Sequence, residues 1–353
     1  MNSTTIRDVA RLAKVSISTV SRVMNMPEAV APDKRERVLE AIRRLEYQPN
    51  GFARGLIFKK SNTLGVLIPD IRNPYYGDII RGMEEAAKQF GYSLMICNTD
   101  RDPERVVGYI EDLREKQVDG LLFASDYVTA LYYETIRKSG VPVVLVSTES
   151  REYGIPSVKV DEEQAAYEAV RHLIALGHRE IGIVCFTLPD PISGEPRYRG
   201  YARALEEAGL EGSKNHVVYA THWFEEAYAA TDVLFQRYPQ LTAVFACSDE
   251  FALGVISCLH DRGIKVPDQV SVIGFDNVRL SRMSIPRLST IAQPMYEIGY
   301  AGVSKLHRLV RNESLETLRD IVPHRLIVRE STGPPGGSGE NRKTIDIRTN
   351  DSF

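Results

Sequence analysis

The feature that most restricts the fold is a repeated alternation of short apolar runs with amphipathic helical stretches, which begins at Leu64. The helical stretches end at a glycine just before the next apolar run, in QFG, KSG, ALG, EAG and DRG. Glycine adopts, without strain, the left-handed conformation that ends many helices. Continuous apolar runs between such helices are typical of parallel strands buried on both faces. The pattern therefore predicts an α/β fold.

The apolar runs form two consecutive series. The first comprises LGVLIPD, SLMICNT, VDGLLFAS and VPVVLVS, and the second begins at IPSVKVD and continues with EIGIVCF, HVVYA, TAVFACSDE and VSVIGFDN. Each series is long enough for one doubly wound parallel sheet. A chain of 353 residues also exceeds what one domain usually holds. We therefore expect a core of two doubly wound α/β subdomains.

Polar residues occupy the positions where such sheets bind ligands, beyond the carboxyl ends of the strands. These residues are Asn73, Tyr75, Tyr76, Ser147, Asp249, Asp276 and Gln293, and we expect them to face one cleft between the subdomains. Asp249 and Asp276 can accept hydrogen bonds from neighbouring hydroxyls of a sugar. Arg197 can donate from the side, and Trp223, the single tryptophan, can cover one face of the ring. The alternatives are a catalytic carboxylate pair and a core tryptophan.

Signatures of enzymes, metals and membranes are missing. The sequence has no GxGxxG, GxxxxGK(S/T) or GxSxG motif. His172 and His178 straddle a helix end rather than forming a metal pair, and the four cysteines, without CxxC spacing, are expected to be reduced core thiols. No apolar run approaches the roughly 20 residues of a membrane span, and the N-terminus has no apolar signal core. We expect no catalysis, cofactor or metal, and a cytoplasmic location.

The first 60 residues differ from the rest in charge. They contain 12 Lys and Arg residues against 6 Asp and Glu residues, a net charge of +6, whereas the remainder carries −9. A small basic module on an acidic body suggests a polyanionic partner for the module alone. A solvated charged surface explains the charge equally well.

Three helices are expected in this basic module. Thr5 can cap the first, with Asp8 at its third position, and Ser16 can cap the second, in VSISTVSRVMN. The short break between them predicts a helix-turn-helix arrangement. The third helix follows at PDKRERVLEAIRRLEY; Ala31 precedes it in place of a capping residue, and its predicted buried stripe is Val38, Leu39, Ile42 and Leu45.

The outward face of the second helix has the chemistry of a DNA-reading surface. With Val20 and Val23 buried, this face carries Ile17, Ser18, Thr19, Ser21 and Arg22. A guanidinium can reach O6 and N7 of guanine, an aliphatic group can touch a thymine methyl, and hydroxyls suit phosphates or less selective base contacts. The alternative is an ordinary surface helix of a small bundle.

TIRDVARLAKVSISTVSRVMN, followed by RVLEAIRRLEYQPNGFARGL, resembles the DNA-binding headpiece of the lactose-repressor (LacI/GalR) family of bacterial transcription regulators. The resemblance implies a headpiece at 1–49, a hinge at 50–61 and an effector-binding and dimerisation core at 62–330. The tail at 331–353 falls outside the resemblance, and its composition predicts disorder. Within the core it implies an N-subdomain of about 62–160 plus 292–320 and a C-subdomain of about 161–291 plus 321–330.

The resemblance also implies which residues bind DNA. The implied set is Thr5, Ser16, Ile17, Ser18, Thr19, Ser21, Arg22, Asn25, Asn50, Ala53, Arg54 and Leu56. Leu56 would wedge between base pairs in the minor groove, which costs unstacking energy but permits a bend that adds contacts. Gly55 departs from the family pattern, because a better helix former is common there.

The core resembles a sugar-binding periplasmic protein of type I, in which the chain crosses between the subdomains three times. This resemblance implies an effector site formed by Asn73, Tyr75, Tyr76, Ser147, Ser193, Arg197, Trp223, Asp249, Asp276 and Gln293. The function implied is that of a homodimeric repressor on a pseudo-palindromic operator, controlled by a small effector, a sugar or sugar derivative. Control by a purine or nucleoside corepressor or by a partner protein, a pure sugar-binding protein and a sugar-modifying enzyme are the alternatives.

Overall fold

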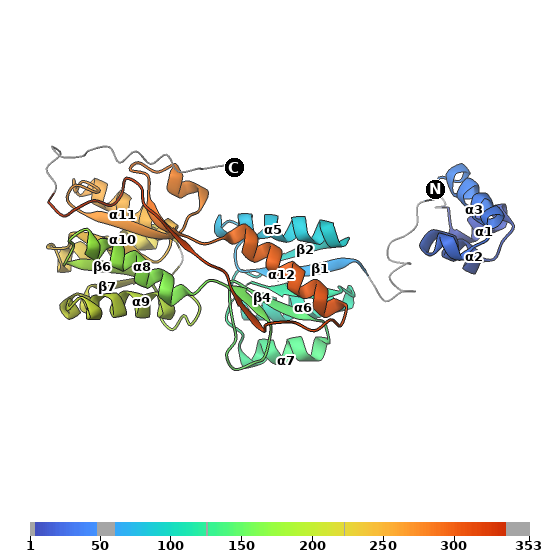
Figure 1. The fold of residues 1–353 in the computed structure, drawn as a ribbon, viewed down its shortest axis with the longest axis horizontal. Coiled ribbons are helices and arrows are strands. Elements are labelled where there is room, and N and C mark those ends of the chain that lie inside the picture. The colour runs from blue at the N-terminus through green and yellow to red at the C-terminus, as the bar shows by residue number, and fades with distance from the viewer. Residues whose placement is uncertain (1–3, 48–60, 125, 222, 337–353) are drawn as a thin grey trace. The chain divides into compact units, whose positions relative to one another are not determined.

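The computed structural model describes residues 4–47, 61–124, 126–221 and 223–336 (Figure 1). The chain divides into two compact units, Met1–Asn62 and Thr63–Phe353. Among the described residues, no helix is long and apolar enough to cross a bilayer. The same residues include no group of three or more His, Cys, Asp or Glu side chains arranged to hold a metal ion.

The described part of the first unit is a small helical bundle. It consists of α1 (Ile6–Ala13), α2 (Ile17–Asn25), the 3-10 turn η1 (Pro27–Ala29) and α3 (Pro32–Arg44), packed around Val9, Ala10, Ala13, Val20, Val23, Val38 and Ala41. Lys14, with a left-handed φ of 51°, ends α1 and lets α2 turn across it. The predicted helix-turn-helix architecture is confirmed. The prediction that Leu39 is buried is wrong: it is 44% exposed, because α3 turns Val38 and Ala41 toward the core instead.

The helix starts in this unit differ in how they are capped. Asp8 Oδ2 accepts hydrogen bonds from the backbone N–H of Thr5 at 3.0 Å and from the Thr5 hydroxyl at 2.6 Å. Ser16 Oγ accepts the N–H of Thr19 at 3.2 Å, as predicted. α3 starts behind Ala31 without a side-chain cap. A missing cap costs about 1 kcal/mol, so α3 depends more on its packing than α2 does.

The second unit is built on two sheets. The strands of the first are β1 (Thr63–Ile68), β2 (Ser93–Asn98), β3 (Gly120–Phe123), β4 (Val143–Val146), β5 (Ser157–Lys159) and β11 (Arg319–Ile321). Those of the second are β6 (Ile181–Phe186), β7 (Val217–Ala220), β8 (Ala243–Ala246), β9 (Ser271–Asp276), β10 (Ser289–Ala292) and β12 (Arg325–Ile327). The orders are β11-β5-β4-β3-β1-β2 and β12-β10-β9-β8-β6-β7, and the β10–β12 pair is antiparallel while the others are parallel. The two predicted doubly wound sheets are confirmed.

Helices cover both faces of each sheet (Figure 1). α5 (Tyr75–Phe90) and α12 (Met295–Val310) pack together on one face of the first sheet, and α6 (Pro103–Glu115) and α7 (Ala130–Ser139) on the other. The second sheet has the pair α8 (Glu162–Ala175) and α9 (Gly194–Glu207), and the pair α10 (Phe224–Arg237) and α11 (Asp249–Asp261). The short 3-10 turns η2 (Glu211–Asn215) and η3 (Arg279–Arg282) complete the described elements. We call the first sheet with its helices the N-subdomain and the second the C-subdomain.

The chain crosses between the subdomains three times: from β5 into α8, from β10 into α12, and from β11 to β12. The prediction that IPSVKVD begins the second series is wrong, because β5 pairs with β4 and β11 in the first sheet. The apolar residues Ile155, Val158 and Val160 predict a buried strand in this segment. They do not specify which of two sheets that strand joins.

The segment after β12 packs against the second sheet. Ser331 Oγ accepts the N–H of Ser289 at 2.8 Å, and Nε2 of His178 lies 2.8 Å from the carbonyl oxygen of Gly333. The prediction that a disordered tail begins at Ser331 is therefore wrong for its first residues. Residues 337–353 lie outside the described part of the chain.

Candidate functional site

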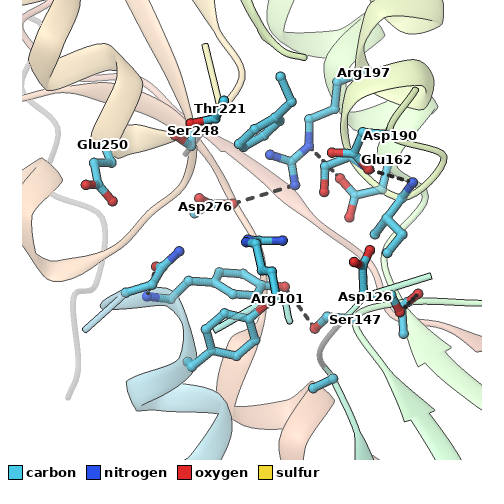
Figure 2. A pocket seen from close by; sticks show the side chains of 18 of the residues that line it. Arg101, Asp126, Ser147, Glu162, Asp190, Arg197, Thr221, Ser248, Glu250 and Asp276 are labelled. Atoms are coloured by element: carbon cyan, nitrogen blue, oxygen red, sulfur yellow. Dashed lines mark hydrogen bonds and ion pairs between the residues drawn. The ribbon is translucent and has the colours of Figure 1, made fainter. Parts of the chain in front are cut away.

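A cavity of about 270 Å³ lies between the N- and C-subdomains (Figure 2). Its walls come from the segments that follow the carboxyl ends of parallel strands in both sheets, as the topology of doubly wound sheets requires. Seven of the ten predicted effector contacts line it: Asn73, Tyr75, Tyr76, Ser147, Ser193, Arg197 and Asp276. The structure therefore brings together most of the predicted site.

Arg197 is the most constrained side chain of the cavity, at 4% exposed. Its Nε donates to Glu162 Oε2 at 2.7 Å, and Nη2 lies 3.8 Å from Asp276 Oδ1. The guanidinium also donates to the backbone carbonyl of Cys247 and lies 3.7 Å from the centroid of the Phe275 ring. Burial lowers the pKa of Arg197, but the two carboxylates outweigh burial and raise it above the usual value. The charge is therefore fixed and already paired.

The pairing of Arg197 with Glu162 depends on a close approach of α8 and α9. A Cβ added at Gly200 would lie 2.2 Å from the carbonyl oxygen of Glu163, so only glycine permits this helix spacing. Glu162, the first residue of α8, thereby meets the first turn of α9. Glu162 was not predicted as a site residue, although it follows directly on a strand and its loop.

Asp276 ends β9 and points its carboxylate into the cavity (Figure 2). Its φ of 119° is in the left-handed region, as is the 63° of Asn277, so the backbone is strained where the strand ends. Burial raises the pKa of Asp276 to about 7, against the opposing effects of Arg197 and a hydrogen bond from Gln293. Near neutral pH this group is therefore able both to accept and to donate a hydrogen bond.

Gln293 lies behind the cavity wall and positions two of its residues. Its Nε2 donates to Asp276 Oδ1 at 2.8 Å, and its Oε1 is 3.1 Å from the hydroxyl of Tyr75. That hydroxyl is also hydrogen-bonded to Ser147 Oγ at 2.9 Å. The network joins β9 and β10 of the C-subdomain to α5 and β4 of the N-subdomain. Gln293 therefore couples the two walls rather than lining the cavity itself.

Two aromatic residues of α5 provide apolar surface and hydroxyl groups. The rings of Tyr75 and Tyr76 meet edge to face, with centroids 5.2 Å apart. Burial is the main cause that raises the pKa of both phenols. Both hydroxyls therefore stay protonated. That of Tyr75 is engaged with Gln293 and Ser147, and that of Tyr76 can donate to a ligand.

The prediction that Asp249 faces the ligand is wrong. Asp249 is completely buried, and its carboxylate accepts the hydroxyl of Thr290 at 2.6 Å and the backbone N–H of Val278 at 2.8 Å. Burial, followed by the negative charge of Asp276, raises the pKa of Asp249. This side chain holds the segment after β9 in place, so Asp249 and Asp276 do not face the cavity as a pair.

Trp223 does not line the cavity either. It is 37% exposed, and the guanidinium carbon of Arg72 lies 4.6 Å from its ring centroid. Arg72 is itself held by Asp70, to which Nε and Nη2 donate at 3.0 and 2.9 Å. Because Arg72 follows β1 and Trp223 precedes α10, this contact joins the two subdomains. The indole face of Trp223 meets a cation of the opposite subdomain. The prediction that Trp223 covers one face of a bound sugar ring is therefore wrong for this structure.

Several charged residues of the cavity were not predicted from the sequence. They are Arg101, Asp126, Glu162, Asp190 and Glu250, all of which line it (Figure 2). Arg101, Asp126 and Asp190 follow the carboxyl ends of β2, β3 and β6, so the rule that identified Asn73 and Asp276 also covers these three. The cavity thus combines acceptors, donors and aromatic surface, which suits a small polyhydroxylated ligand.

In the first unit, α2 presents the predicted polar face. Ser16, Ile17, Ser18 and Arg22 are exposed, whereas Val20 and Val23 are buried. Ser16 Oγ is hydrogen-bonded to the hydroxyls of Ser18 at 2.8 Å and Thr19 at 2.9 Å, and Thr19 and Ser21 are half-buried. The predicted contacts Asn50, Ala53, Arg54 and Leu56 lie outside the described residues, as does the side chain of Asn25.

Comparison with family models matches nearly the whole described chain. Residues 5–50 match the model for bacterial regulatory proteins of the lacI family. Residues 61–330 match the model for periplasmic binding proteins and the sugar binding domain of the LacI family. The second match begins at residue 61, within two residues of the division between the two compact units at Asn62 and Thr63.

Individual proteins show the same similarity over full length. Catabolite control protein A of Priestia megaterium is 42% identical over 328 residues, which cover 93% of this chain and 99% of that protein. The ribose operon repressor of Halalkalibacterium halodurans is 36% identical over 339 residues, 96% of this chain and 99% of that protein.

Solved structures agree with the fold. The lac repressor dimer bound to operator and an anti-inducer matches with a TM-score of 0.85 at 26% identity, over 94% of this chain and all of that one. A complex of the transcriptional regulator CelR with cellobiose matches with a TM-score of 0.72 at 29% identity, covering 93% and 99%. A LacI family regulator from Enterococcus faecium with bound ribose matches with a TM-score of 0.70 at 29% identity, covering 77% and 99%.

Proposed function

Because this chain belongs to the LacI family of bacterial regulatory proteins and is a DNA-binding transcriptional regulator, we propose that it acts as a homodimeric repressor whose operator affinity is set by a small ligand in the inter-subdomain cavity. The headpieces of the two copies read the half-sites of a pseudo-palindromic operator, which matches the two-fold symmetry of a dimer. A regulator of this kind works in the cytoplasm, where it meets DNA.

The observation that carries this proposal is the cavity built from both subdomains. A ligand that contacts Arg197 and Asp276 on one wall and Tyr75 and Ser147 on the other binds one arrangement of the walls better than another. Such a difference in affinity shifts the population of arrangements. A coupling of about 1–3 kcal/mol between two sites changes affinity about 5–150-fold, which is sufficient for regulation.

At the DNA, α2 supplies the chemistry for reading base edges. Arg22, exposed on its outer face, can donate to O6 and N7 of guanine, and Ser18 and Ile17 make the less selective and the apolar contacts. Thr5, Ser16, Thr19 and Ser21 bring hydroxyls toward phosphates, which position the protein without specifying sequence.

We propose a sugar or sugar derivative as the ligand. The relatives with bound cellobiose and ribose support this choice, as does the mixture of hydrogen-bonding and aromatic groups in the cavity. A purine or nucleoside corepressor, or a partner protein, is the competing means of control. No catalytic role is proposed, since the related proteins are transcriptional regulators; turnover of a bound sugar would contradict this.

The proposal is tested by a thermal-shift screen of sugars, sugar phosphates and purine nucleosides on the full-length protein. A ligand at 100 times its dissociation constant adds about 2.7 kcal/mol of stability. We expect a hit that is lost in Asp276→Ala and kept in Glu111→Ala, which changes an exposed carboxylate of α6. A hit that survives Asp276→Ala, or a screen without any hit, contradicts the assignment of the cavity.

A further inference from the structure

We infer that the ligand carries a positively charged group, a protonated amine beside its hydroxyls, and that this group sits between Asp126 and Asp190. The inference rests on the proposed function of the cavity and specifies the class of its ligand. An amino sugar is the simplest compound of this class.

The lining of the cavity carries a net negative charge. Five carboxylates line it: Asp126, Glu162, Asp190, Glu250 and Asp276. Against them stand two guanidiniums, Arg101 and Arg197, and among the described lining residues there is no lysine or histidine. With all groups ionised the lining has a net charge of −3, and it still has −2 when Asp276 is protonated.

The more deeply buried of the two cations, Arg197, is already paired with carboxylates of the protein. Arg197 is paired with Glu162 at 2.7 Å and faces Asp276 at 3.8 Å. It is buried, bonded to the carbonyl of Cys247 and covered by Phe275. An anionic ligand would have to break a buried ion pair to reach this guanidinium, which is costly because it leaves Glu162 without its partner.

Asp126 and Asp190 lie on opposite walls of the cavity. Asp126 follows β3 of the N-subdomain, and Asp190 follows β6 of the C-subdomain. Both labelled side chains lie toward the right of the cavity in Figure 2. Burial raises the pKa of Asp126, and the negative charge of Asp190 adds to this while Arg101 opposes it. Both carboxylates thus line the same cavity, one from each subdomain.

Both carboxylates have one oxygen fixed by the local backbone. Asp126 Oδ1 accepts the N–H of Tyr127 at 2.7 Å, and Asp190 Oδ1 accepts the N–H groups of Ile192 and Ser193 at 3.0 and 3.1 Å. These bonds hold the two side chains in place from opposite sides. Among the described residues, Oδ2 of neither makes a hydrogen bond, so the second oxygen of each remains for a ligand.

Ligands of different charge should therefore bind the cavity differently. Bringing a phosphate or carboxylate between Asp126 and Asp190 adds like charge in a partly desolvated space, where Coulomb repulsion is several-fold stronger than in water. A neutral sugar donates hydrogen bonds but adds no positive charge, so Arg101 remains the cation that offsets the negative charges of Asp126 and Asp190. An ammonium group satisfies both oxygens and favours approach of the two walls.

The test uses isothermal titration of the full-length protein at pH 7.5 with matched sets of compounds. Each set has one carbon skeleton in three forms: the neutral hexose, its 2-amino derivative and its 6-phosphate, for glucose, galactose and mannose. For at least one skeleton we expect the amino form to bind at least 10-fold more tightly than the neutral form, and the phosphate not to bind. Asp190→Asn, which keeps the shape and removes the charge, should abolish this preference, and so should Asp126→Asn. Glu111→Gln should retain it.

The outcomes separate this inference from the proposed function. Tighter binding of a neutral or phosphorylated form overturns the inference, and so does a preference for the amine that survives Asp190→Asn and Asp126→Asn. Failure of every amino compound to bind also overturns it. The proposed function fails only if no compound of any charge binds the cavity, or if binding leaves the affinity for DNA unchanged.

Discussion

Replacing Arg197 by methionine tests how the buried charges of the cavity are balanced. The change keeps most of the side-chain volume and leaves Glu162, 3% exposed, without its guanidinium. Removing one partner of a buried ion pair costs about 3–5 kcal/mol. Protonation of Asp276 can remove part of the repulsion between its carboxylate and that of Glu162, since the pKa of Asp276 is already about 7. We therefore expect a loss near the lower end, about 3 kcal/mol in the free energy of unfolding.

The assay is urea denaturation followed by the fluorescence of Trp223. This residue is the single tryptophan and lies in the C-subdomain beside α10, so its signal reports the unfolding of the subdomain that holds Arg197. The double variant Arg197→Met with Glu162→Gln should recover much of the loss, because it removes the charge left uncompensated.

Arg199→Met is the matched control on the same helix. Arg199 donates to Glu163 at 2.9 Å, but its side chain is 46% exposed, and exposed ion pairs contribute less than about 1 kcal/mol. A loss below about 1 kcal/mol in Arg197→Met, or a double variant less stable than Arg197→Met alone, would refute the reasoning about buried charge.

Three further changes test other parts of the structure. Ala31→Ser should supply the missing cap of α3 and stabilise the first unit by about 1 kcal/mol, visible in the thermal melting of its helices by circular dichroism; no gain would contradict the cap argument. Asp276 has a raised pKa, so the folded state binds its proton more tightly and wild-type stability should fall as pH rises from about 4 to 7, by up to about 1.4 kcal/mol per pH unit relative to Asp276→Asn; parallel pH profiles would contradict this. Arg72→Gln removes the cation from the indole face of Trp223, so the emission of the tryptophan should change and the contact between the subdomains should weaken by about 0.5–1 kcal/mol; an unchanged spectrum would show that the contact is not formed in solution.

The α/β architecture follows from the sequence because apolar periodicity and helix-ending glycines are local signals. Gly91 and Gly140 have the positive φ that their place before a strand predicts. The sheet that β5 joins is not a local property, because a buried strand centred on Val158 suits either sheet and its pairing with β4 depends on tertiary contacts. The burial of Leu39 was mispredicted for a similar reason, because two adjacent apolar residues on a helix cannot both face a narrow core.

The candidate site shows the same division. Asp276 could be placed in the cavity because strand order fixes where the carboxyl ends of parallel strands meet, whereas Arg197, in the first turn of α9, was placed there by the family resemblance. Whether a side chain at such an end turns into the cavity or back into its own loop depends on neighbours that the sequence does not place. Asp249 turns back to Thr290, and Trp223 faces Arg72. The acidic residues Asp126 and Asp190 could have been found with the same rule applied to every strand end.

The most direct test of the account is the effect of a cavity ligand on DNA binding. DNA fragments selected from random duplexes by the full-length protein would be titrated by fluorescence anisotropy, with and without the ligand identified by thermal shift. We expect the ligand to change the dissociation constant for the selected fragment by about 5–150-fold and to leave that for random duplex nearly unchanged. Arg22→Ala should lose the preference for the selected fragment, and Asp276→Ala should lose the response to ligand. A ligand that binds the cavity without changing affinity for the selected fragment would contradict the central claim.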